Sequence, residues 1–201
     1  PHRAKLGEAA TWDAFSQKFY WVDIEEKKLF QLNSSTREWK MFTMPDRIGT
    51  LTPYNGKQIV VALQNEIALF DTEKEILKTL SLLEADKHDT RANDGKCDPA
   101  GRLWIGTMQL DVKTGGANLY CLNHDLHLKK KIANVTISNG IVWTADHKKM
   151  FYIDTPTKQI TAYDYDMRAA KISQKKIAVR VPKNMGSPDG MTIDSEDMIW
   201  V

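Results

Sequence analysis

The sequence is poor in the features that mark several specialised classes of protein. It contains 2 cysteines in 201 residues, Cys97 and Cys121, and they form neither a CxxC pair nor a Cys/His metal spacing. We therefore expect free buried thiols rather than a disulfide scaffold or a cysteine zinc site. Neither sign of charge dominates, because 28 Lys and Arg residues face 26 Asp and Glu residues and leave a net charge of +2. This balance argues against nucleic acid as a partner.

Long apolar runs and familiar catalytic motifs are missing as well. No apolar run approaches the roughly 18 residues that span a bilayer, and no leader of the signal-peptide type opens the chain. We expect a cytoplasmic protein without membrane contact, although the chain opens on Pro1 rather than Met, which leaves secretion open. The absence of GxSxG, HExxH and P-loop sequences removes support for a serine hydrolase, a zincin or a P-loop enzyme.

The sequence is instead rich in short strand patterns that repeat. Runs of β-branched and aromatic residues, each preceded by a turn sequence, recur as FYWVDI, QIVVAL, RLWIGT, MFYIDT and MIWV. Their equivalent positions follow one another at intervals of 39, 45, 47 and 48 residues. These positions are Phe19, Gln58, Leu103, Met150 and Met198. A four-stranded propeller blade takes roughly 40 to 50 residues, so the intervals are typical of blades.

We therefore predict an all-β fold with six-bladed β-propeller architecture. The chain is expected to hold roughly the first four to five blades, as a single propeller domain over residues 1–201 that lacks the last blade and the closure of the ring. Asp23 and Asp154 fall at equivalent positions of two blades. We predict that both are turn or capping groups.

Four polar segments precede strand-and-turn units at matching places in the repeat. They are LGEAATWD (6–13), RANDGK (91–96), ISNGIVW (137–143) and SPDGMTID (187–194). Taken singly, Asn-Gly and Asp-Gly are ordinary hairpin turns. Their matching positions favour a shared function, because the loops that enter the innermost strands of a propeller converge on its channel. We predict a channel-side turn at residues 93–95 and an outer hairpin turn at residues 98–101.

Three residues of these segments form a candidate metal site. If Glu8, Asn139 and Asp189 converge, they supply two carboxylates and one amide oxygen. This set of hard oxygen donors suits Ca²⁺ or Mg²⁺ and tolerates Mn²⁺ or Zn²⁺, with positions left for water. Buried carboxylates without compensation are costly, which is a further reason to expect a cation.

Across these segments the chain resembles the senescence marker protein/gluconolactonase family, the regucalcin-like sugar lactonases. The stretches that carry the resemblance follow the family's order over nearly the whole chain: LGEAATWD, YWVDI, RANDGKCDPAGRLWIGTM, ISNGIVWTAD, FYIDTP and SPDGMTID. The resemblance implies a six-bladed propeller with one catalytic divalent cation, preferably Ca²⁺, with Zn²⁺, Mg²⁺ and Mn²⁺ as alternatives. Its ligands would be Glu8, Asn139 and Asp189. One departure is Ala9-Ala10, where the family commonly has Gly-Pro.

The resemblance also implies substrate contacts and a reaction. Arg91 and Asn93 would hold hydroxyl and ring oxygens of the substrate, and Asp111 falls near a further acidic residue of the pocket. The expected reaction is hydrolysis of a sugar-acid lactone by metal-activated water, with Asp189 both ligating the metal and accepting the water proton. Arg91 offers a planar fork of donors, and Asn93 offers a donor and an acceptor. We expect a small-molecule sugar lactone as the partner, and a monomer or weak dimer.

Two alternatives remain open at this point. The same scaffold with an oxygen-ligated metal would also serve a phosphotriester or aryl-ester hydrolase. A Ca²⁺-binding or protein-interaction propeller without catalysis is the other alternative, and it predicts metal binding without turnover.

Overall fold

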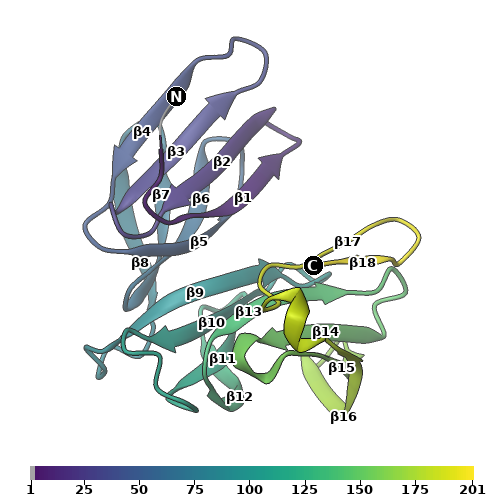
Figure 1. The fold of residues 1–201 in the computed structure, drawn as a ribbon. Coiled ribbons are helices and arrows are strands. Elements are labelled where there is room, and N and C mark those ends of the chain that lie inside the picture. Colours follow the sequence, from purple (N-terminus) through teal and green to yellow (C-terminus); the bar gives the residue numbers. More distant parts are fainter. Residues whose placement is uncertain (1–2) are drawn as a thin grey trace. The chain divides into compact units, whose positions relative to one another are not determined.

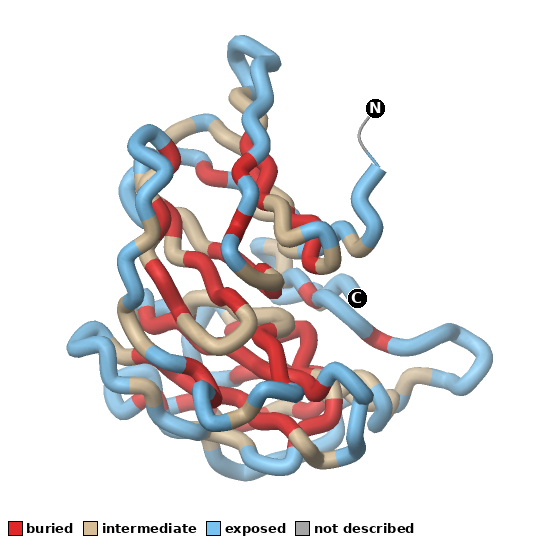
Figure 2. Tube along the Cα trace, turned by 90° about the vertical axis from the view of Figure 1, so that its left-hand side faces the viewer, coloured by how far each residue is buried: buried red, intermediate tan, exposed pale blue. Residues whose placement is uncertain are grey.

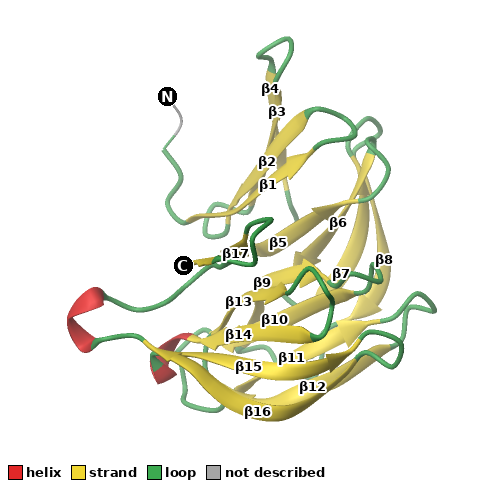
Figure 3. Cartoon of the chain, turned by 90° about the vertical axis from the view of Figure 1, so that its right-hand side faces the viewer, coloured by secondary structure: helices red, strands yellow, loops and turns green. Residues whose placement is uncertain are grey.

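The computed structural model describes residues 3–201, and this part of the chain is built almost entirely from strands (Figure 3). Its helical content is two single turns of 3-10 helix, η1 (Thr155–Thr157) and η2 (Lys183–Met185). Among the described residues, no helix has the length and apolar character needed to cross a membrane. The all-β prediction is confirmed.

The strands form successive antiparallel meanders, in which each strand pairs with the next one along the chain (Figure 1). The first sheet contains β1 (Gly7–Asp13), β2 (Lys18–Asp23), β3 (Lys28–Asn33) and β4 (Trp39–Thr43). The second contains β5 (Ile48–Pro53), β6 (Gln58–Leu63), β7 (Glu66–Asp71) and β8 (Ile76–Leu82). The third contains β9 (Thr90–Cys97), β10 (Leu103–Gln109), β11 (Ala117–Leu122) and β12 (Leu128–Val135).

The fourth sheet repeats this pattern, and a short hairpin follows it. The fourth sheet contains β13 (Ser138–Trp143), β14 (Lys149–Asp154), β15 (Gln159–Asp166) and β16 (Lys171–Arg180). The hairpin pairs β17 (Thr192–Ile193) with β18 (Ile199–Trp200). Four-stranded meanders are the blades of a β-propeller, so the predicted architecture is confirmed for the four to five blades expected here.

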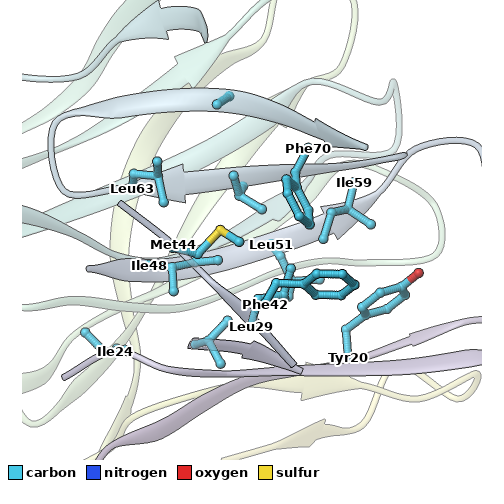
Figure 4. Packing of buried hydrophobic residues seen from close by; sticks show 13 residues of the cluster. Tyr20, Ile24, Leu29, Phe42, Met44, Ile48, Leu51, Ile59, Leu63 and Phe70 are labelled. Atoms are coloured by element: carbon cyan, nitrogen blue, oxygen red, sulfur yellow. The ribbon is translucent and has the colours of Figure 1, made fainter. Parts of the chain in front are cut away.

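The chain divides into two compact units, one ending at Ala92 and the other beginning at Asn93. Each unit has its own core between neighbouring sheets, because one sheet cannot bury both of its faces alone. In the first unit, Phe42 and Phe70 meet edge to face with ring centroids 5.1 Å apart (Figure 4). The prediction that residues 1–201 form a single domain stays a prediction.

The second unit has two such cores. The Trp104 ring centroid lies 5.9 Å from that of Trp143 and 6.0 Å from that of Tyr165, which joins the third sheet to the fourth. Met191 packs with Ile153 and other residues of the fourth sheet, which joins the fourth sheet to the hairpin. Figure 2 colours the trace by burial and shows several buried stretches separated by exposed ones.

Equivalent aspartates cap equivalent backbone segments, as the internal repeat predicts. Asp23, at the end of β2, accepts hydrogen bonds from the N–H groups of Lys5 and Leu6 just before β1. Asp154, at the end of β14, accepts them from Thr136 and Ile137 just before β13. The capping role of both residues is confirmed.

The predicted channel-side turn at residues 93–95 is wrong. Residues 93–95 lie inside β9, and Asn139 and Gly140 lie inside β13. The strand β13 accommodates Asn139 and Gly140 because it contains a bulge between Asn139 and Ile141, where one extra residue is inserted. The outer turn at residues 98–101 is confirmed, with Gly101 at a φ of 79°.

Candidate functional site

Glu8 and Asn139 occupy the same structural position in two different sheets. In β1 the pairing with β2 shifts between Glu8 and Thr11, and in β13 the pairing with β14 shifts between Asn139 and Ile141. A bulge leaves one residue unpaired and re-aims the side chains beside it. The two predicted oxygen donors therefore each stand at the start of a bulge in the first strand of their sheet.

A chain of hydrogen bonds links the third sheet to the fourth around Asn139, which is buried. The side-chain amide of Asn93 donates to Oδ1 of Asn139 at 3.1 Å and to the carbonyl of Ser138 at 2.8 Å. Nδ2 of Asn139 donates to Oγ1 of Thr155 at 2.8 Å, and the Thr155 hydroxyl donates to the carbonyl of Pro188 at 2.9 Å. These contacts fix the amide of Asn139 so that its oxygen faces Asn93.

Asp189 lies in the loop between η2 and β17, against the backbone of β13. Its carbonyl oxygen accepts a hydrogen bond from the N–H of Gly140 at 3.0 Å, while the residue itself is exposed. Gly140 has no room for a side chain, because a Cβ there would lie 2.5 Å from the Cβ of Met191 and 2.8 Å from the Asp189 carbonyl oxygen. The absence of a Cβ at this position lets the Asp189 loop approach Asn139.

Asp94 adds a carboxyl group that the sequence analysis did not select. Burial raises the pKa of Asp94, and the negative charge of Asp189 acts in the same direction. The second unit therefore brings together Asn93, Asn139 and the Asp189 loop, with Asp94 within electrostatic reach.

The first unit contains two further predicted polar residues, Glu8 and Arg91. Arg91 is buried, and its Nη1 donates to the carbonyl of Ala92 at 2.9 Å. Burial lowers the pKa of Arg91, the negative charges of Glu25 and Glu8 oppose this shift, and the positive charge of Arg47 adds to it. Glu8 and Arg91 thus lie within electrostatic reach of each other. The convergence of Glu8 with Asn139 and Asp189 stays a prediction.

Asp111 lies apart from these contacts. It follows β10 in an exposed turn, where Oδ1 accepts a hydrogen bond from the N–H of Lys113 at 3.3 Å. A role of Asp111 in substrate binding stays a prediction.

Comparison with known proteins identifies the family. Residues 6–201 match the model of the SMP-30/Gluconolactonase/LRE-like region. The chain belongs to this family. Regucalcin of Homo sapiens is 33% identical over 207 residues, which cover 100% of this chain and 69% of the relative. YvrE of Bacillus subtilis, whose name proposes a sugar lactone lactonase, is 33% identical over 199 residues, which cover 99% of this chain and 68% of the relative.

A solved structure extends the family likeness to three dimensions. The crystal structure of a calcium-binding protein, regucalcin, from Agrobacterium tumefaciens superposes with a TM-score of 0.94 at 26% identity. The match covers 99% of this chain and 68% of that one.

The oxygen donors of the second unit are of the kind that the predicted divalent cation prefers. The amide oxygen of Asn139 and the carboxylates of Asp94 and Asp189 are hard donors, which Ca²⁺ and Mg²⁺ prefer. A cation would also offset the mutual repulsion of the two carboxylates, which contributes to the raised pKa of Asp94. Within residues 3–201, no three His, Cys, Asp or Glu side chains form a group that could hold a metal ion. The predicted ligands Glu8, Asn139 and Asp189 include an asparagine, so a search for three His, Cys, Asp or Glu side chains does not test them.

Sequence reasoning missed several residues that surround the predicted site residues. Thr155 and Ser138 position the two asparagines, and Arg47, whose charge helps to lower the pKa of Arg91, pairs with Glu25 at 3.4 Å. Thr155 follows the repeated aspartate in FYIDTP, so its place in a quoted family stretch was the available indication. Arg47 stands in none of the family stretches.

Proposed function

We propose that this chain hydrolyses a sugar-acid lactone in a reaction that depends on a divalent cation. The family match over residues 6–201 supports this, as do the name of YvrE and the name of the gluconolactonase family itself. The observation that carries the proposal is the hydrogen bond between Asn93 and Asn139, because it links an expected substrate residue to an expected metal ligand.

Glu8, Asn139 and Asp189 would hold the cation. When bound, such a cation polarises a carbonyl oxygen and lowers the pKa of water in its coordination sphere. Ca²⁺ is the preferred ion, since a related solved structure carries the name of a calcium-binding protein. Zn²⁺, Mg²⁺ and Mn²⁺ are the alternatives that the oxygen donors accommodate.

The chain's own residues would bind the lactone and move one proton. Asp189 accepts a proton from the attacking water, whose oxygen forms a bond to the lactone carbonyl carbon. The bond between that carbon and the ring oxygen breaks, and the ring oxygen leaves as a hydroxyl because it takes the proton that Asp189 accepted from the water. Arg91 donates to substrate oxygens through its planar fork, and an amide oxygen such as that of Asn93 accepts from a hydroxyl. Asp111 is the further acidic residue proposed for substrate binding.

Parallel assays separate this proposal from its alternatives. Initial rates are measured with gluconolactone, an aryl phosphotriester and an aryl ester, each before and after a chelator and after return of Ca²⁺. We expect lactone turnover well above spontaneous hydrolysis, its loss with the chelator and its return with the cation. Preference for the phosphotriester or aryl ester would favour the other hydrolases. Cation binding without any turnover would favour a non-catalytic propeller.

A further inference from the structure

Lys96 is a half-buried cation of the segment RANDGK that the proposed reaction does not use. It lies in β9 on the same strand as Asn93 and Asp94 and is only partly accessible. Its ammonium group donates to the carbonyl of Met191 at 3.0 Å, across 95 residues of sequence. Burial lowers the pKa of Lys96, and the negative charge of Asp94 opposes that shift.

The carbonyl that Lys96 contacts belongs to segment 188–191, which carries Asp189. This segment contains no strand or helix, so side chains and backbone groups of other elements must hold it. Three of its four carbonyls accept hydrogen bonds from separate donors: Thr155 to Pro188 at 2.9 Å, Gly140 to Asp189 at 3.0 Å, and Lys96 to Met191 at 3.0 Å. The Lys96 contact is the one made by a charged donor, and charge-assisted hydrogen bonds are the stronger kind.

Because Asp189 is exposed, burial of its own side chain does not hold it in place, and the backbone contacts of segment 188–191 take that role. Met191 is buried, and its Cβ lies where a side chain of Gly140 would otherwise be. Segment 188–191 is therefore held at both ends, by Thr155 near Pro188 and by Lys96 at Met191.

We propose that Lys96 is a positioning residue that holds segment 188–191 against β9 and β13, and so sets the place of the Asp189 carboxylate relative to Asn139. The inference rests on the proposed function, because it assigns Asp189 a role at the cation and the water. Lys96 acts through the segment and contacts neither substrate nor cation.

The two effects that Lys96 can have, anchoring the segment and repelling a cation through its charge, predict opposite changes in cation affinity when Lys96 is neutralised. Removal of a positive charge near a cation site lowers repulsion, so the charge effect alone would tighten binding when Lys96 is neutralised. Loss of the anchor would loosen the Asp189 loop and weaken binding. Changes to groups that orient metal ligands typically cost about tenfold to 100-fold in affinity or activity.

The experiment compares Lys96→Met and Lys96→Arg with a matched control, Lys131→Met. Lys131 also donates through its ammonium group to a carbonyl of the second unit, that of Ala170 at 2.7 Å, and its ammonium group lies 5.5 Å from the centre of the Trp104 ring. Three quantities are measured on the full chain: Ca²⁺ affinity by calorimetry, kcat and KM on gluconolactone, and hydrogen exchange of the Gly140 amide without cation. Thermal unfolding is recorded for each variant.

We expect Lys96→Met to weaken Ca²⁺ binding by about tenfold or more. The variant should lower kcat by a larger factor than it changes KM, and the Gly140 amide should exchange its hydrogen faster. Lys96→Arg should restore much of each property, since it keeps the donor and the charge. Lys131→Met should lower thermal stability and leave the other three measurements at wild-type values. Unchanged or tighter Ca²⁺ binding in Lys96→Met would overturn the proposal, as would unchanged exchange at Gly140. If the wild type neither binds Ca²⁺ nor turns over lactone, the proposed function fails, and the exchange result alone still decides whether Lys96 anchors the segment.

Discussion

The side chains of Asn93 and Asn139 are joined by a hydrogen bond, in which Nδ2 of Asn93 donates to Oδ1 of Asn139 at 3.1 Å. The two residues lie in the first strands of neighbouring sheets, 46 positions apart in sequence. An amide has two distinguishable ends, so this bond and the contact of Asn139 with Thr155 together orient the Asn139 oxygen. The proposed substrate and cation contacts of this chain are therefore expected to depend on one another.

Asn93→Ala should impair the site without unfolding the chain. Loss of the donor frees the Asn139 amide to rotate, so we expect kcat/KM on gluconolactone to fall by about tenfold to 100-fold and Ca²⁺ to bind more weakly. Asn118→Ala is the control, because its buried amide donates to the hydroxyl of Tyr120 at 3.1 Å on β11. The control should lose stability and keep wild-type Ca²⁺ affinity. Equal Ca²⁺ affinity in wild type and Asn93→Ala would contradict the expectation.

Ala9→Gly should stabilise the first unit. Ala9 follows Glu8 in the bulge of β1 and has a φ of 54°, in the left-handed region that costs a residue with a Cβ roughly 1 kcal/mol or more. Glycine adopts this conformation without that cost, so we expect a rise of about 2 to 4 °C in Tm. Ala10→Gly is the matched control and should lower Tm, since glycine within a strand is destabilising. A drop in Tm for both variants would show that Ala9 is not strained.

Asp98→Asn should remove a stability contribution that depends on pH. Burial raises the pKa of Asp98, but hydrogen bonds from Tyr165, Arg102 and Trp104 outweigh it and hold the pKa below its ordinary value. A carboxyl group with a lowered folded-state pKa stabilises above its unfolded pKa of about 3.9, and this contribution is lost as the pH falls through the folded-state pKa.

Urea unfolding at neutral pH and near pH 3 tests this dependence. At neutral pH, the free energy of unfolding of Asp98→Asn should lie roughly 3 kcal/mol below that of the wild type, as expected when one partner of a buried ion pair is removed. Near pH 3 the difference in free energy of unfolding between Asp98→Asn and the wild type should be smaller. Asp46→Asn, which alters a surface pair with Lys27, is the control and should change little. A difference between Asp98→Asn and wild type that is the same at both values of pH would contradict this account.

Local patterns in the sequence predicted the sheets well. The strand runs, their intervals and the repeated aspartates Asp23 and Asp154 each depend on residues close together in the chain, where alternation and turn chemistry act directly. The same local rules failed at residues 93–95 and at Asn139. There, Asn, Asp and Gly resemble a turn, but pairing with neighbouring strands keeps them extended and a bulge absorbs the extra residue of β13.

The supporting residues of the site were out of reach of such rules. The contacts of Asn93 with Ser138 and of Lys96 with Met191 span 45 and 95 residues of sequence. They arise only when separate blades pack together, and no local periodicity encodes them. The matching polar segments pointed to Asn139 and the family resemblance pointed to Asn93, but only the structure shows the hydrogen bond between them.

The most direct test of the account is the initial rate of gluconolactone hydrolysis by the double variant Glu8→Gln, Asp189→Asn, measured beside the wild type in the presence of Ca²⁺. The two substitutions remove the carboxylates proposed to hold the cation and to accept the water proton, while keeping the size of each side chain. We expect the wild type to hydrolyse the lactone well above the spontaneous rate and the double variant to fall to that rate with its thermal unfolding preserved. Turnover by the double variant at the wild-type rate would contradict the account.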